Sequence, residues 1–314
     1  MATRRIGLAL GSGSARGWSH IGVIESLAEA GIVADIVCGT SIGAFVGAAY
    51  VAGRLTELRR WAETVTWREI VALMDVGLSA GGLINGKEVI SFLRGLGVDG
   101  TIESHNKRYV AVATDLANGR EIWLESGPIL EAVRASIALP GIFSPASVNG
   151  KWLVDGGLSN PVPVSVCRAL GAEVIIAVNL NGDLLGRRFV SEPEVKATLP
   201  SGVPSEFLSR VLKQLPAALR EQAGQILPRL VPQGSSTPGY FDVLANSINI
   251  MQDHITRARL AGEPPHVMLA PRLRDIGLME FNRAKEAIAE GQYCVEQALP
   301  TLRRYIEPTS GNPL

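Results

Sequence analysis

The sequence predicts an α/β fold in which a mainly parallel central sheet is flanked by helices on both faces. Short apolar runs typical of buried strands alternate with longer segments of helical periodicity along most of the chain. The composition is that of a globular protein, with 46% hydrophobic and 19% charged residues. At 314 residues the chain can bury a large core, and this length suits either one large domain or two small ones.

The expected strands are short apolar runs. They lie at residues 6–10, 36–38, 109–114, 121–124, 152–154, 174–178 and 266–269. The expected helices have apolar positions that recur at helical spacing. They lie at residues 20–30, directly after Ser41, and at 55–64, 87–96, 162–170 and 281–299.

Residues 181–240 differ from this pattern because they are rich in Pro, Gly and Ser. Residues 205–231 within them have helical spacing, which Pro216 and Pro228 would interrupt. We interpret the segment as a helical or loop insertion on the α/β core. Two roles stay open: a lid or membrane-contacting segment, or a surface helix pair packed on the core or on a second subunit.

The bulk composition excludes several classes of protein. Thirty basic residues balance thirty acidic ones, whereas a general nucleic-acid binder carries a basic excess, so no nucleic-acid partner is expected. The three cysteines are widely spaced and odd in number, which argues against a disulfide framework or a zinc site and favours a reducing compartment. No run reaches the roughly 18 apolar residues of a membrane span. We therefore expect a cytoplasmic protein, any membrane contact being peripheral and at the inner face.

The pentapeptide Gly39-Thr40-Ser41-Ile42-Gly43 follows the apolar run at 36–38 and precedes a helical segment. This is G-x-S-x-G in a strand–turn–helix setting, the pattern of a nucleophile elbow. In such an elbow a serine sits on a sharp turn with its hydroxyl exposed at the end of a sheet. The flanking Gly39 and Gly43 suit a turn too tight for Cβ atoms.

A glycine-rich loop follows the first expected strand and precedes the first helix. Its residues are Gly11, Ser12, Gly13, Ser14, Ala15, Arg16 and Gly17. Such a loop can direct several backbone N–H groups toward an anion. Two anions are considered: a dinucleotide pyrophosphate and the oxyanion of an acyl-transfer intermediate. Arg16 disfavours the dinucleotide, because that fingerprint has Gly or Ala at its sixth position.

Asp155, Gly156 and Gly157 come directly after the expected strand at 152–154. A carboxylate at a strand end is well placed to accept a proton from a serine, although Asp-Gly is also a common turn pair. No histidine clearly follows this aspartate in the Ser–Asp–His order of ordinary α/β-hydrolases. A serine with an aspartate as its only base therefore deserves weight over a triad.

Ordered blocks of the sequence carry a resemblance to a known family. They are Ala15-Arg16-Gly17 with His20-Ile21-Gly22-Val23, Gly39-Thr40-Ser41-Ile42-Gly43, Gly82-Leu83-Ile84 with Gly86-Lys87, Ala135-Ser136-Ile137-Ala138-Leu139-Pro140-Gly141-Ile142-Phe143, and Asp155-Gly156-Gly157. Over most of its length the chain resembles the patatin-like phospholipases, in particular bacterial single-domain members related to neuropathy target esterase. The resemblance implies a single domain over residues 1–314 with a patatin-like, modified α/β-hydrolase fold.

The resemblance also implies a lipid acyl hydrolase whose substrate is a lipid or small ester. Ser41 would be the nucleophile and Asp155 the base, with oxyanion donors from the loop amides around Ser12, Gly13 and Ser14. Arg16 would brace that loop or meet an anionic head group. Neither a metal nor a cofactor is implied. The oligomeric state stays open, and an oligomer is compatible with the sequence.

One departure from the family concerns the loop, where members commonly have consecutive glycines and this chain has Ser12 and Ser14. A serine at positive φ would be strained by roughly 1 kcal/mol. Because the altered loop could have lost turnover, one alternative to the hydrolase is a catalytically weak or silent lipid-binding or regulatory protein on the same fold. A nucleotide-binding oxidoreductase is a more distant alternative.

Overall fold

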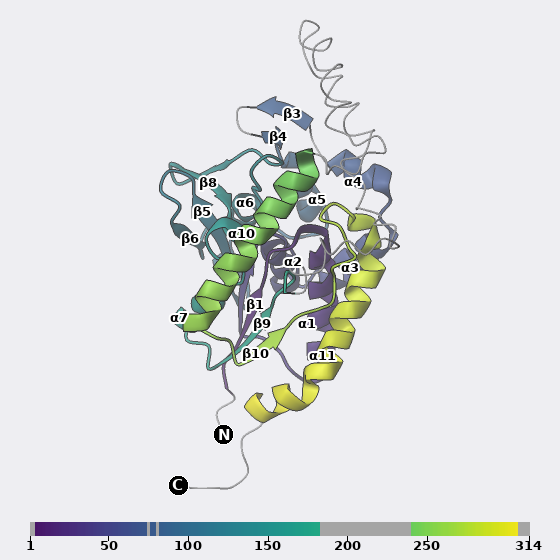
Figure 1. Cartoon of the computed structure of the whole chain (residues 1–314), viewed down its shortest axis with the longest axis vertical. Coiled ribbons are helices and arrows are strands. Elements are labelled where there is room, and N and C mark those ends of the chain that lie inside the picture. Colours follow the sequence, from purple (N-terminus) through teal and green to yellow (C-terminus); the bar gives the residue numbers. More distant parts are fainter. Residues whose placement is uncertain (1–3, 74–75, 80–81, 183–239, 307–314) are drawn as a thin grey trace, which may run out of the picture.

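The computed structural model describes residues 4–73, 76–79, 82–182 and 240–306, and places most of the strands in one eight-stranded sheet (Figure 1). The sheet strands are β1 (Ile6–Leu10), β2 (Ile36–Thr40), β5 (Arg108–Asp115), β6 (Glu121–Leu124), β7 (Ala146–Val148), β8 (Lys151–Asp155), β9 (Val174–Val178) and β10 (Val267–Leu269). Their order is β10-β9-β1-β2-β5-β8-β7, and β6 also pairs with β5. A separate antiparallel pair is formed by β3 (Val76–Ser79) and β4 (Gly82–Ile84).

Strands β10, β9, β1, β2 and β5 run parallel to one another. Strands β6 and β8 run antiparallel to β5, and β7 runs antiparallel to β8. This confirms the mainly parallel sheet that the sequence predicts.

The helices lie between and after these strands. They are η1 (Ser14–Trp18), α1 (Ser19–Glu29), α2 (Ile42–Val51), α3 (Leu55–Thr64), α4 (Trp67–Leu73), α5 (Lys87–Gly95), η2 (Ile102–Ser104), α6 (Ile129–Ser136), η3 (Gly156–Leu158), α7 (Val164–Ala169), α10 (Tyr240–Gly262), η4 (Phe281–Arg283) and α11 (Ala284–Ile306). Every expected strand and helix is present. Most ends shift by at most two residues, but the last helix starts three residues later than expected and ends seven residues later, at Ile306. Sequence patterns did not predict α4, α6, β7 or the β3–β4 pair, and they indicated α10 only as a helix of unstated bounds around His254. Of the insertion expected at residues 181–240, all but residues 181, 182 and 240 lie outside the described residues.

Side chains of the central strands alternate between two apolar cores, one on each face of the sheet. In β1, Leu8 and Leu10 belong to a large core that includes residues of α1, α2, α6 and α11. Ala9, between them, belongs to a smaller core with Val166 and Cys167 of α7. Because both faces are covered, each residue of β1, β2 and β9 is buried, which explains their uninterrupted apolar sequences.

Strand β5 brings the ends of two distant strands together. On one of its sides, β2 pairs as far as Thr40 opposite Val112, and β8 pairs from Asp155 opposite Ala113. Strand β6 pairs with residues 111–114 of β5 throughout this interval. Since a strand has only two sides, β2 and β8 must share the other one and meet end to end.

Helices α1 and α11 cross in backbone contact and lie side by side in Figure 1. A Cβ atom at Gly22 of α1 would lie 2.0 Å from the carbonyl oxygen of Ile288, and one at Gly291 of α11 would lie 2.1 Å from that of Ser19. Neither distance is possible, so the crossing needs both glycines. It fixes the start of α1 and therefore the loop that precedes it. Separately, none of the described helices is long and apolar enough to cross a membrane.

We predict that Gly22→Ala destabilises the protein by about 2 kcal/mol or more, because the new methyl group would force the two helices apart. Gly95→Ala is the matched control: Gly95 is exposed in α5 and a Cβ there meets nothing within 4 Å. That control should stabilise the protein by about 0.5–1 kcal/mol. Urea unfolding followed by circular dichroism measures both, and equal midpoints for the two variants would contradict the backbone contact.

Candidate active site

Ser41 is the single residue between the end of β2 and the start of α2, and it is held in a strained conformation. Its φ of 57° and ψ of −124° lie in a region that residues other than glycine rarely adopt. A Cβ at Gly43 would lie 2.1 Å from the carbonyl oxygen of Leu10, and one at Gly39 would lie 2.4 Å from that of Gly43. The turn is therefore as tight as the G-x-S-x-G pattern indicates.

The hydroxyl of Ser41 donates a hydrogen bond to Asp155, with Oγ and Oδ2 2.5 Å apart. The other carboxylate oxygen of Asp155, Oδ1, accepts from the backbone N–H of Gly157 at 2.7 Å. Asp155 is fully buried, and burial raises the pKa of its carboxyl group from 3.8 to about 6, against the opposing effect of its two hydrogen bonds. The structure thus brings Ser41 and Asp155, 114 residues apart, into direct contact.

Ser136, at the end of α6, ties this pair to β5. Its hydroxyl donates to the carbonyl oxygen of Val112 at 2.6 Å and accepts from the backbone N–H of Ser41 at 2.9 Å. Thr114, two residues further along β5, donates to the carbonyl oxygen of Asp155 at 2.9 Å. Sequence reasoning gave Ser136 no role. The only signal was its place in one of the blocks that resemble the family.

The loop after β1 offers two unused backbone donors. The amide of Gly11 donates to Val178 O at 3.0 Å, and that of Ser12 donates to Pro161 O at 2.9 Å. Among the hydrogen bonds of the described residues, the amides of Gly13 and Ser14 have no acceptor. The amides of Gly13 and Ser14 are therefore available to an anion, whereas those of Gly11 and Ser12 are already engaged.

Of the two serines that replace glycine in this loop, only Ser14 has a positive φ, at 54°. The strain expected from the sequence, of roughly 1 kcal/mol, therefore applies at Ser14 and not at Ser12. Gly17, at the other end of the loop, allows η1 to pack on the start of α2. A Cβ there would lie 2.2 Å from Cγ1 of Ile42.

Arg16 is buried and braces the loop from inside. Its Nε donates to Gly13 O at 3.2 Å, and one terminal nitrogen donates to Oδ1 of Asn249 at 3.1 Å. Only 1% of the residue is exposed. This burial favours the bracing role over contact with a lipid head group.

His20 also supports the loop. Its Nε2 lies 2.8 Å from the carbonyl oxygen of Gly11 and, because that oxygen can only accept, the nitrogen must be protonated. Burial lowers the pKa of His20 to about 4, so the ring is neutral near pH 7. The hydrogen bonds of Ser41 and Asp155 described above do not include it.

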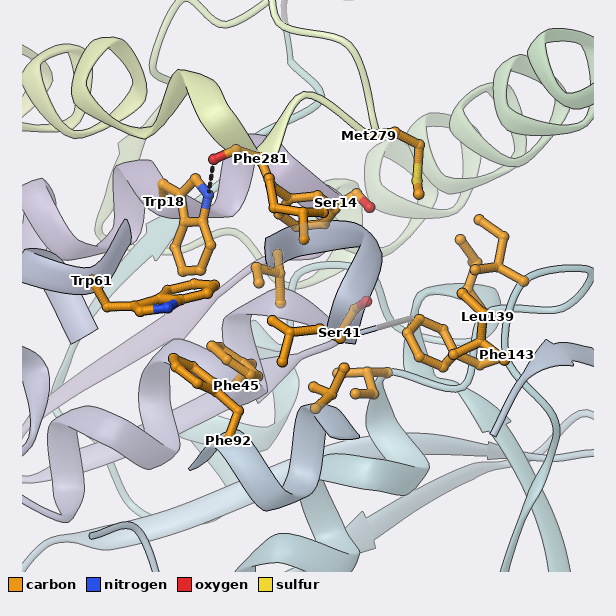
Figure 2. A pocket seen from close by; sticks show the side chains of 17 residues that line it. Ser14, Trp18, Ser41, Phe45, Trp61, Phe92, Leu139, Phe143, Met279 and Phe281 are labelled. Atoms are coloured by element: carbon orange, nitrogen blue, oxygen red, sulfur yellow. Dashed lines mark hydrogen bonds between the residues drawn. The ribbon is translucent and has the colours of Figure 1, made fainter. Parts of the chain in front are cut away.

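Ser41 opens into an apolar pocket with about 850 Å³ of empty space, its solvent-filled mouth included. Among the described residues, its lining is apolar or aromatic apart from Ser14 and Ser41. Figure 2 shows Ser41 between two groups of side chains. One contains Trp18, Phe45, Trp61 and Phe92, and the other contains Leu139, Phe143 and Met279.

The aromatic group closes one end of the pocket. The rings of Trp61 and Phe92 are 4.2 Å apart between centroids, and the ring of Trp18 packs edge-on against Trp61 at 6.0 Å. Trp18 is itself fixed, because its indole N–H donates to the carbonyl oxygen of Phe281 at 3.0 Å. Within the described ranges, no group of three or more His, Cys, Asp or Glu residues could hold a metal ion.

Comparison with known proteins bears on this arrangement. The family model of patatin-like phospholipases matches residues 8–168, which include Ser41 and Asp155. An uncharacterized NTE family protein of Mycobacterium tuberculosis is 36% identical, with 94% of this chain and 91% of the relative covered. Patatin-like phospholipase domain-containing protein 7 of Rattus norvegicus is 35% identical over 56% of this chain and 13% of its own length.

A solved structure, that of VipD from Legionella pneumophila, is similar over 98% of this chain and 81% of its own, at 12% identity. Its TM-score of 0.35 is too low to support an argument. The family match and the mycobacterial relative confirm the resemblance drawn from the motifs: this chain belongs to the patatin-like phospholipase family.

Proposed function

We propose that this protein is a serine-dependent lipid acyl hydrolase in which Ser41 is the nucleophile and Asp155 the only base. The observation that carries the proposal is the 2.5 Å hydrogen bond from Ser41 Oγ to Asp155 Oδ2 beside an apolar pocket. Family membership supports hydrolysis of a lipid as the reaction class.

In the first half of the reaction, Asp155 takes the proton from Ser41 as Oγ attacks the ester carbonyl carbon. The carbonyl oxygen gains the negative charge, and the free amides of Gly13 and Ser14 are the donors we assign to it. The partial positive charge at the start of α2, directly after Ser41, favours the same charge. Asp155 then returns its proton to the departing alcohol, which leaves an acyl group on Ser41.

In the second half, water replaces the alcohol. As the oxygen of the water attacks the carbonyl carbon of the acyl-enzyme, Asp155 accepts a proton from that water. Asp155 then returns the proton to Ser41 Oγ as the carboxylic acid leaves. A carboxylate with a pKa of about 6 suits both halves. It is ionised near pH 7, yet it is a stronger base than an ordinary aspartate.

The pocket supports an aliphatic acyl chain as the group that is transferred. Each methylene buried there contributes about 0.8 kcal/mol, so longer chains gain until they meet the rings of Trp61 and Phe92. We further propose a cytoplasmic location with peripheral membrane contact, which the free thiols of Cys38, Cys167 and Cys294 support.

The first prediction concerns the Ser–Asp pair. Ser41→Ala and Asp155→Asn should each lower kcat/KM for a nitrophenyl butyrate ester by at least about 10³-fold, since each removes a group needed in the same step. Ser147→Ala is the control, because Ser147 is exposed on β7 and should leave the rate unchanged. A fluorophosphonate should label the wild type and not Ser41→Ala.

Hydrolysis or labelling that survives Ser41→Ala would refute the nucleophile assignment. A folded wild type that binds lipid vesicles but neither turns over esters nor reacts with fluorophosphonate would favour the silent lipid-binding alternative.

The second prediction concerns pH. Because only ionised Asp155 can accept a proton and its pKa is raised to about 6, kcat/KM should be about ten-fold lower at pH 5 than on the plateau above pH 7. Folding should show the opposite trend. The unfolded carboxyl, with the ordinary pKa of 3.8, ionises more readily than the folded one, so this group reduces stability as pH rises from about 4 to 6.

Asp155→Asn lacks this ionisation and should gain stability relative to the wild type over that interval, by at most about 3 kcal/mol. Thermal unfolding of both proteins at pH 4, 5, 6 and 7 measures the difference. A constant difference at all four values would show that the pKa of Asp155 is not raised.

The third prediction concerns acyl length. Trp61→Ala should shift the preference toward longer nitrophenyl esters, because it opens the aromatic end of the pocket. Each further methylene admitted should raise kcat/KM by about four-fold. Trp152→Ala is the matched control, since Trp152 is 60% exposed on β8. The same chain-length profile in both variants would contradict the acyl-pocket assignment.

A further inference from the structure

Two side chains of α10 accept hydrogen bonds from the loop after β1, on either side of its two free amides. Ser12 Oγ donates to Oε1 of Gln252 at 2.9 Å, and Arg16 donates to Oδ1 of Asn249 at 3.1 Å. Ser12 and Arg16 flank Gly13 and Ser14, the residues whose amides are free. All four side chains in these two contacts are at most 5% exposed.

Asn249 and Gln252 are spaced to act together. Residues three apart lie on the same face of a helix, so one face of α10 meets both ends of the loop at once. Gln252 Oε1 also accepts from Nδ2 of Asn181 at 3.1 Å, just beyond the end of β9. The same helix thus joins the loop after β1 to the segment after β9.

Gln252 also reaches the turn that carries the proposed base. A Cβ built on Gly157 would lie 2.3 Å from Nε2 of Gln252 and 3.0 Å from Oδ1 of Asp155. The amide group of Gln252 therefore packs on the Asp155-Gly156-Gly157 turn as well as on the loop.

The loop requires such support because its backbone does not hold the two amides by itself. Backbone hydrogen bonds anchor Gly11 and Ser12 on one side and Ala15, which donates to Leu278 O at 3.0 Å, on the other. Ser14 between them has a φ of 54°, a conformation that persists only where the surroundings enforce it. An oxyanion donor must also lie within a few tenths of an ångström of its best position.

We propose that Asn249 and Gln252 are positioning residues that hold the amides of Gly13 and Ser14 in place for the oxyanion, which rests on the proposed hydrolase function. They act through Arg16 and Ser12 and touch no reacting atom. Both lie outside the family match at residues 8–168. A further part of the machinery therefore comes from a helix outside that match.

The test compares Gln252→Met and Asn249→Leu with the wild type. Each variant has a side chain of similar shape and loses the acceptor, so kcat for nitrophenyl butyrate should fall by about 10- to 100-fold, less than the loss of a donor outright. KM should change by less than about three-fold, because the acyl pocket is untouched. The rate of fluorophosphonate labelling should fall with kcat.

Two controls separate positioning from general loss of stability. His254→Ala alters an exposed residue of the same helix and should leave kcat unchanged. Leu302→Ala removes a buried side chain of α11 and should lower the melting temperature without lowering kcat. Gln252→Glu keeps an acceptor for the hydroxyl of Ser12, so it should retain a larger share of the wild-type kcat than Gln252→Met does.

Ser12→Ala supplies a second route, because it removes the donor of the same hydrogen bond whose acceptor Gln252→Met removes. If Ser12 and Gln252 act through one hydrogen bond, Ser12→Ala combined with Gln252→Met should lose no more activity than Gln252→Met alone. Hydrogen–deuterium exchange of a peptide over residues 11–18 should be faster in Gln252→Met and unchanged in His254→Ala.

Unchanged exchange, or kcat within two-fold of wild type in both folded variants, would overturn the proposal. A decrease in kcat no larger than that of an equally destabilised Leu302→Ala would do the same. A wild type inert toward both esters and fluorophosphonate would instead refute the hydrolase function, and the exchange measurement would still decide whether α10 holds the loop.

Discussion

The rest of the site depends on the pairing of both β2 and β8 with the same side of β5, where they meet at Val112 and Ala113. Strand β2 ends there in one direction and β8 ends there in the other, so Ser41 and Asp155 meet without being near in sequence. The junction leaves no room for a side chain at Gly156, where a Cβ would lie 2.2 Å from Val112 O. Because Ser136 bonds to the same carbonyl group and to the amide of Ser41, one residue of β5 positions both members of the pair.

Burial gives the site its chemistry and also its cost in stability. Removing Asp155 from water raises the pKa of its carboxyl group and makes it a better proton acceptor for a serine. The same effect lowers the pKa of His20, which remains neutral and holds the loop through Gly11 O. One physical cause therefore explains why the aspartate is suited to act as the base and the histidine to a structural role. The stability lost at Asp155 is tolerated because the surrounding sheet has a core on each face.

Much of this arrangement is predictable from the sequence because burial on both faces produces uninterrupted apolar strands such as β1 and β9. The motifs place Ser41 and Asp155 at strand ends for the same reason. Their contact is not predictable from local patterns, because it depends on β8 running antiparallel to β5 and following β2 along the same side. Helix α6 was not predicted, although its last residue, Ser136, accepts a hydrogen bond from the amide of Ser41, the proposed nucleophile. It is short, and a lone serine in an apolar segment has no distinctive signal.

The contacts between α10 and the loop after β1 could not be predicted from motifs. Gln252 lies 240 positions from Ser12, and no spacing rule relates a side chain on a late helix to a loop at the start of the chain. Ser12 is itself informative, because family members commonly have glycine there and glycine has no hydroxyl to donate to Gln252. In the sequence, the serine at position 12 is a departure from the family's loop. In the structure, the same serine attaches the loop to α10. Ser14, the second substitution, adds strain at the position that this attachment helps to hold.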